Sequence, residues 1–133
     1  MKKLENFCNC LETLKTADFE LAQRDDIYKT GVIGQFNLTF ELSWKALQGV
    51  MKLFGVAQAE TGSPGEILLL AYKFGFIDNE AVWLKMLKKR NTAIHIYNEG
   101  EIDEMLREIK NDFIPVFEEL REGLEEKIRQ LNV

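Results

Sequence analysis

The sequence predicts an all-α protein, an up-and-down antiparallel helical bundle of four main helices and one short helix. Apolar residues recur every three to four positions along most of the chain, which is the spacing of one face of a helix. No segment keeps the apolar–polar alternation of a half-buried strand, and no internal repeat is present. The 133 residues are 46% hydrophobic and 29% charged, a composition that fills one core beneath a charged surface. We therefore expect a single domain over residues 1–133.

The first predicted helix covers residues 3–22 and holds both cysteines. Only Asp18 interrupts its apolar spacing, and residues 24–26 are typical of a turn followed by a helix start. Cys8 and Cys10 would point roughly 200° apart on a helix, so they cannot bridge each other there. With one histidine in the chain, a zinc site of cysteine and histidine within one subunit is not credible. We therefore expect free, mostly buried thiols, no metal site and no cofactor.

The second predicted helix runs from Asp26 or Tyr28 to Phe54. Gly31 and Gly34 each weaken it by up to about 1 kcal/mol relative to alanine. They either allow a close approach of another helix, or the helix begins after Gly34. The expected buried stripe consists of Val32, Phe36, Phe40, Trp44, Leu47, Met51 and Phe54.

A short third helix follows a loop. Gly55 suits the C-terminal cap of the second helix, and residues 56–62 form the loop. In Ser63-Pro64-Gly65-Glu66, the serine caps, the proline fits the first helical position and the glutamate completes a capping box. The helix should then end at Gly75.

Two more helices complete the bundle. Asp78 is expected to cap the fourth, which ends near Arg90, and the last begins near Glu101. Pro115 lies inside the last apolar stripe, so we expect either a kink or a break with Pro115 opening the next segment. The stripe consists of Ile102, Met105, Ile109, Phe113, Val116, Leu120, Leu124 and Leu131.

Charge and hydropathy limit the class of protein. The net charge of −5 argues against a protein that coats long nucleic acid by charge alone. It still permits a small basic site, and Lys85, Lys88, Lys89 and Arg90 form such a cluster, whereas residues 99–126 are rich in acids. Because no run of 18 apolar residues and no N-terminal apolar stretch is present, we expect a cytoplasmic protein without membrane contact.

Residues 88–97 carry the candidate chemistry, including the single histidine of the chain. On an unbroken helix Arg90 and Tyr97 share one face, and Asn91 and His95 share another. Arg90 and His95 would lie roughly 140° apart. They can meet if the helix loosens after Asn91, or across a subunit interface.

An arginine with a histidine suits phosphate chemistry. The guanidinium matches phosphate oxygens, and the imidazole can move a proton near neutral pH. Metal-independent RNA cleavage needs a second acid or base, which Tyr97, a lysine or the histidine of a second subunit would supply. A two-fold homodimer would bring two copies of His95 to one cleft. In the alternative interpretation, His95 is structural and Tyr97 is a packing residue with a solvated hydroxyl.

Three further residues are candidates for a supporting role. Glu41 and Lys45, four apart, either form a simple helix pair contributing roughly 0.3 to 0.5 kcal/mol or support the site from a partly buried position. The amide of Asn91 could orient His95 one turn away.

The order of these motifs resembles a known family. Arg90-x4-His95-x-Tyr97 is similar to the Arg-x4–6-His signature of the HEPN superfamily, and most closely to its HepT-like branch of nucleotidyltransferase substrate-binding proteins. Phe36-x3-Phe40-Glu41-Leu42-Ser43-Trp44-Lys45 resembles the second-helix motif of that branch. Further residues resemble the middle part of the pattern of that branch: Ser63-Pro64, Ala71, Gly75, Phe76, Ile77 and Trp83.

The resemblance implies a helical-bundle homodimer encoded beside a small nucleotidyltransferase. In toxin–antitoxin pairs of this kind the HEPN subunit is a metal-independent ribonuclease, and the partner silences it by adenylylating the motif tyrosine. Arg90 would then bind and neutralise phosphate, His95 would be the general acid or base, and Tyr97 the modified residue. Beside these, we take Lys88 and Lys89 as further candidates for phosphate binding because they lie next to Arg90. The alternative within the same family is a non-catalytic subunit that binds a nucleotide or substrate for the partner enzyme. A purely structural helical partner is disfavoured, because it gives no reason for the three motif residues to occur together.

Overall fold

The computed structural model describes residues 1–91 and 98–132, and the regular structure in these ranges is helical. No helix in this part of the chain is long and apolar enough to cross a membrane. The elements are α1 (Lys2–Lys15), α2 (Phe19–Arg24), α3 (Asp26–Leu53), a 3₁₀ turn η1 (Ala57–Glu60), α4 (Pro64–Lys73), α5 (Glu80–Asn91), α6 (Glu99–Glu108), a π-helical turn η3 (Ile109–Phe113) and α7 (Ile114–Leu131).

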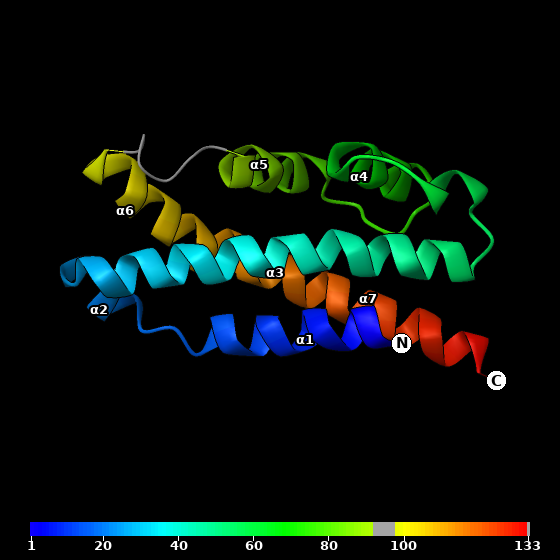
Figure 1. Ribbon diagram of the computed structural model, residues 1–133, viewed down its shortest axis with the longest axis horizontal. Coiled ribbons are helices and arrows are strands. Elements are labelled where there is room, and N and C mark those ends of the chain that lie inside the picture. The colour runs from blue at the N-terminus through cyan, green and yellow to red at the C-terminus, as the bar shows by residue number, and fades with distance from the viewer. Residues whose placement is uncertain (92–97, 133) are drawn as a thin grey trace.

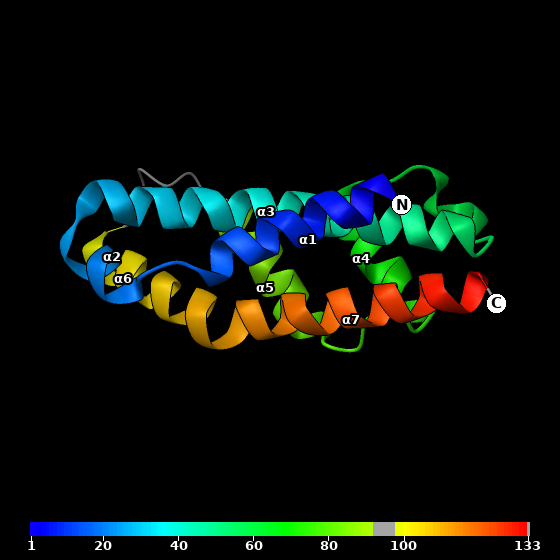
Figure 2. The same ribbon diagram turned by 90° about the horizontal axis from the view of Figure 1, so that it is seen from below.

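The predicted up-and-down bundle is confirmed. The long helix α3 runs through the middle, antiparallel to α1 and to the α4–α5 layer, and α6 leads into α7 (Figure 1). Figure 2 shows α1 lying across α3 and α7, on the side opposite α4 and α5. Aromatic rings join these layers: Phe36 stacks on Phe113 at 5.3 Å, and Trp83 meets Phe117 edge-on at 5.8 Å. These contacts fix α5 on the body formed by α3 and α7.

The expectation of one helix over residues 3–22 is wrong. The chain leaves helical geometry after Lys15, and Asp18 adopts an extended conformation. Its carboxylate accepts hydrogen bonds from the backbone N–H groups of Glu20 and Leu21, so it caps a new helix rather than interrupting an old one. The two cysteines are free thiols, as expected, but both are half-buried rather than mostly buried.

Helix α3 begins at Asp26 and continues through both of its early glycines. Among the residues that the structure describes, nothing lies within 4 Å of where a Cβ would stand on Gly31 or Gly34, so neither glycine marks a close approach of one of the described helices. The stripe of α3 is buried except at two aromatic residues: Trp44 is half-buried and Phe54 is 36% exposed. Gly55 has φ +79°, the left-handed conformation expected after a helix end.

The later helix boundaries follow local chemistry. The capping box at Ser63 and Glu66 is present, with both reciprocal hydrogen bonds. Helix α5 begins at Glu80, slightly later than a cap at Asp78 would place it.

Of the two expectations at Pro115, a kink or a break, the break is not found: α6, η3 and α7 follow one another without a non-helical residue, and Pro115 is the second residue of α7, behind the π-helical turn. Proline has no N–H to donate to the carbonyl one helical turn earlier. The N–H of Ile114 donates to the backbone oxygen of Ile109, five residues earlier, which is the π-helical pattern. Leu131, at the end of the predicted stripe, is 45% exposed rather than buried.

Candidate functional site

The basic cluster of the sequence lies at the C-terminal end of α5. Lys88, Lys89 and Arg90 occupy its last turn, where positive side chains interact favourably with the helix dipole. The end of α5 lies alongside α3 and faces the α6 side of the bundle (Figure 1). A compact group of cations is therefore built on one edge of an acidic protein.

Arg90 forms an ion pair across the bundle with α3. Its Nη2 donates to Oε2 of Glu41 at 2.5 Å, although 49 residues separate the two in sequence. The side chains are 29% and 31% exposed, so the pair is partly shielded and still reachable from solvent. Lys45, one turn further along α3, lies 3.6 Å from the other carboxylate oxygen. Glu41 is thus the acceptor for two cations of the predicted site.

The charge of Glu41 is stabilised by this arrangement. Partial burial would raise the pKa of its carboxyl group, but the hydrogen bond from Arg90 and the charges of Arg90 and Lys45 outweigh burial. The pKa of Glu41 therefore lies below its ordinary value, and the carboxylate is ionised at neutral pH. An incoming phosphate would have to compete with it for Arg90.

A second carboxylate, which the sequence analysis missed, holds the opposite face of α5. Glu108 of α6 is buried, and its oxygens lie 2.5 Å from Nζ of Lys85 and 3.5 Å from Nζ of Lys89. The ion pair raises the pKa of Lys85. The sequence does contain a signal for this contact. Glu108 directly precedes Ile109 of the buried stripe, and Lys85 and Lys89 lie four apart, so both lysines can reach one carboxylate.

The structure brings together some of the predicted site residues. Arg90, Glu41 and Lys45 meet as described, and Lys89 is directed toward α6. Lys88 lies in the same last turn, and Asn91 is the final residue of α5. His95 and Tyr97 lie outside the described residues, so their predicted roles remain predictions.

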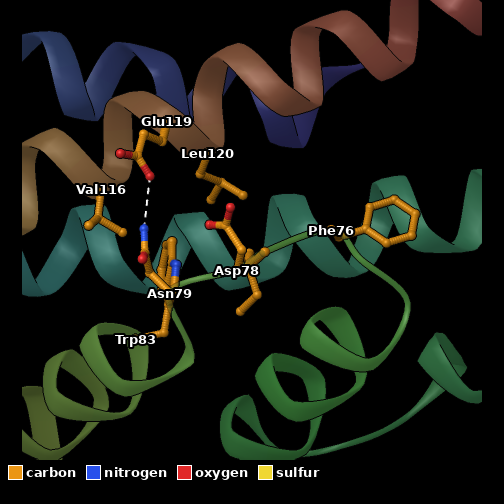
Figure 3. Close-up of a pocket in the computed structure, with 8 residues that line it drawn as sticks. Phe76, Asp78, Asn79, Trp83, Val116, Glu119 and Leu120 are labelled. Atoms are coloured by element: carbon orange, nitrogen blue, oxygen red, sulfur yellow. Dashed lines mark hydrogen bonds between the residues drawn. The ribbon is translucent and has the colours of Figure 1, made fainter.

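A separate cavity between the start of α5 and α7 is not part of this group (Figure 3). Its volume is about 50 Å³, and Asn79 closes one side by donating from Nδ2 to Oε2 of Glu119 at 2.9 Å. A nucleotide-sized ligand needs a cleft of at least about 300 Å³. This cavity is therefore too small for such a ligand.

Comparisons with known proteins cover nearly the whole chain. The sequence profile of a family described as "Nucleotidyltransferase substrate binding protein like" matches residues 2–126. A crystal structure of a protein from Thermus thermophilus is similar, with 28% sequence identity and a TM-score of 0.66. The similarity covers 92% of this chain and 98% of that chain. None of the curated proteins compared with the chain matches it significantly.

Proposed function

Because the chain belongs to the family of nucleotidyltransferase substrate-binding-like proteins, we propose that it is the helical partner subunit of a small nucleotidyltransferase encoded nearby. We further propose that this subunit is a metal-independent ribonuclease of the HEPN type, acting as the toxin of a toxin–antitoxin pair. Its active cleft would form between the two subunits of a homodimer.

The observation that carries the proposal is the environment of Arg90. A guanidinium at the end of a cation-rich helix, paired with a partly exposed carboxylate, is positioned to exchange that carboxylate for a phosphate. Arginine offers the same forked donor geometry to both anions. Lys45 lies beside Glu41 and would compensate its charge after the exchange. We assign Arg90 to phosphate binding, with Lys88 and Lys89 strengthening the local positive potential.

His95 would perform the proton transfers. Five positions after Arg90 in sequence, its imidazole is the one side chain of the chain whose ordinary pKa lies near neutrality. In-line cleavage of RNA requires removal of the 2′-hydroxyl proton and protonation of the leaving oxygen. Two copies of His95, one from each subunit, would supply both steps, with Asn91 orienting the ring. Adenylylation of Tyr97 by the partner would then add an anion that occupies the same cations.

The second candidate is a subunit that binds a nucleotide or RNA substrate and performs no chemistry. The family description favours it, because the description names substrate binding and no cleavage. The Arg90–Glu41 exchange would serve this function equally well.

An RNA cleavage assay separates the two functions. The protein is incubated with single-stranded RNA in the presence of a metal chelator, beside Arg90→Ala and His95→Ala. Cleavage by the parent that both variants lose, while thermal unfolding shows that they remain folded, supports the ribonuclease. Binding without cleavage in the parent supports the substrate-binding subunit, and cleavage retained by His95→Ala would exclude His95 as the acid or base.

A further inference from the structure

The middle helix α3 has an exposed stripe without charged residues, which we call its outer face. Ile27 is 87% exposed and Leu38 is 47% exposed, and Thr30, Gly31 and Gly34 between them are exposed as well. At 3.6 residues per turn these five positions fall within one stripe about 100° wide, on the side of α3 away from its buried residues. Solvent-facing stripes of helices normally carry charges, and 29% of this chain is charged. An uncharged stripe on the central helix is therefore typical of a surface that another protein covers.

None of the described helices covers the outer face. Figures 1 and 2 show α3 and α7 on opposite sides of the bundle. Lys29, the one charged residue in the range 27–38, turns to another side of the helix and pairs with Asp103 of α6 at 3.6 Å. Among the described residues, nothing lies within 4 Å of a Cβ built on Gly31 or Gly34. Beside these glycines a groove of about 370 Å³, lined by residues of α1 and α3, can receive a side chain from a partner.

The outer face reads the same from either end. Ile27 stands four positions before Gly31, and Leu38 stands four positions after Gly34. If a second α3 lies antiparallel across the first, a two-fold axis midway between the glycines sets Gly31 of one copy opposite Gly34 of the other. The same axis sets Ile27 of one copy opposite Leu38 of the other. Glycines at a helix crossing let two backbones approach closely, and the large apolar side chains then pack on either side. A two-fold dimer requires such a self-complementary surface.

The charges beyond the two ends of the face are complementary in this register. Arg24 comes three positions before Ile27, and Glu41 comes three positions after Leu38. The two-fold axis therefore brings Arg24 of one copy near Glu41 of the other. Arg24 is exposed and has no ion pair within the described part of the chain, so it is available to a carboxylate of a second copy. Opposite charges at both ends favour the antiparallel pair over a parallel one, in which Arg24 would meet its own copy.

We propose that the outer face of α3 is the interface of the homodimer, where it packs antiparallel against the same face of a second copy. This inference rests on the homodimer of the proposed function and adds its surface and its register. Glu41 follows Leu38 by less than one helical turn, so the pair of Glu41 with Arg90 borders the interface in each subunit. The cations that we assign to phosphate binding then lie beside the seam between the two subunits.

The first test uses two pairs of matched variants. Leu38→Glu places a charge in the proposed interface, and Leu69→Glu does the same on α4 at a leucine that is 49% exposed. Gly34→Leu fills the proposed crossing point, and Gly123→Leu fills an exposed position of α7 where nothing described lies within 4 Å of a Cβ either. Light scattering over a concentration series gives the dissociation constant of the dimer, and circular dichroism gives the helix content. For Leu38→Glu and Gly34→Leu we expect a dissociation constant at least about tenfold higher than that of the parent, and for both controls an unchanged one.

Disulfide cross-linking tests the register. The variant with both Ile27→Cys and Leu38→Cys is oxidised beside the parent and each single variant, and covalent dimers are read on a non-reducing gel. Two cysteines form a disulfide only when their Cα atoms lie within about 7 Å of each other. In the proposed register the two copies of residue 27, or of residue 38, lie roughly 16 Å apart along the helices. We therefore expect covalent dimers from the double variant and few from the single variants or the parent, whose thiols are Cys8 and Cys10.

The outcomes separate the interface from the proposed function. A dimer that keeps its dissociation constant in Leu38→Glu and Gly34→Leu overturns this interface but leaves the ribonuclease dimer in place, as does equal cross-linking of the single and double variants. A control that weakens the dimer as much as its matched variant also overturns the interface. If the parent is a monomer at micromolar concentration, the homodimer of the proposed function falls together with this inference. If Leu38→Glu then prevents that monomer from binding the nucleotidyltransferase, the outer face belongs to that partner instead.

Discussion

Replacing Glu41 by glutamine tests whether the carboxylate competes with phosphate for Arg90. Glutamine keeps the size and one oxygen acceptor but removes the charge that holds the guanidinium at 2.5 Å. Fully exposed ion pairs contribute about 0.2–1 kcal/mol, and breaking a buried pair costs about 3–5 kcal/mol. With both side chains roughly one-third exposed, we expect Glu41→Gln to cost about 1 kcal/mol of unfolding free energy, or about 4 °C in Tm.

The same substitution should strengthen anion binding. In the parent, a phosphate that binds Arg90 must first break the pair with Glu41, which costs up to about 1 kcal/mol. Glu41→Gln removes this cost, so RNA binding should be up to about fivefold tighter. Fluorescence polarisation in the His95→Ala background measures this affinity. The matched control is Glu12→Gln, which breaks the ion pair with Arg121 between α1 and α7 and should leave RNA affinity unchanged.

The pH dependence gives a second check on Glu41. Its folded pKa is lowered, so its contribution to stability is present above the ordinary value of 4.5 and is lost as the pH falls through the folded pKa. The difference in Tm between the parent and Glu41→Gln should therefore be full at pH 7 and shrink below pH 4.5. RNA binding that weakens in Glu41→Gln, at unchanged fold, would refute the reasoning and show that the carboxylate is needed to position Arg90.

The remaining predictions concern assembly, modification and the buried Glu108. Light scattering at micromolar concentration should give about twice 15.4 kDa, and a monomer would remove the two-histidine cleft. Tyr97→Phe should no longer accept AMP from the partner nucleotidyltransferase with ATP and magnesium, as read by intact mass, whereas transfer equal to that of the parent would exclude Tyr97 as the target. Lys85→Met removes the nearer of the two lysines that pair with the buried Glu108 in the described part of the chain, so urea unfolding should show a loss of about 1–2 kcal/mol. An unchanged midpoint would mean that the pair with Lys85 does not stabilise the fold.

Local interactions made most of the helices predictable. The capping box at Ser63 and the glycine after α3 each depend on atoms within about four residues of one another, so the chain shows them directly. Pro115 likewise indicates a local disturbance of its helix, which in the structure is the π-helical turn. The single helix predicted over residues 3–22 was wrong because the role of Asp18 is not decided by its near neighbours alone. Asp18 suits a cap or an exposed position within a helix, and a hydrogen bond from its backbone N–H to the hydroxyl of Tyr28, ten residues away, accompanies its role as a cap.

By itself, the sequence determined the helical class, the antiparallel order and the set of residues from which a site could be built, because periodicity and capping act along the chain. Only the tertiary structure decided which of those residues meet. Glu41 and Arg90 contact across 49 positions, and Glu108 is buried against the lysines of α5. Such contacts depend on how far α5 and α6 lie from α3 and at which register they pack. Those quantities are set by the interlocking of aromatic side chains in the core, which no short stretch of sequence encodes.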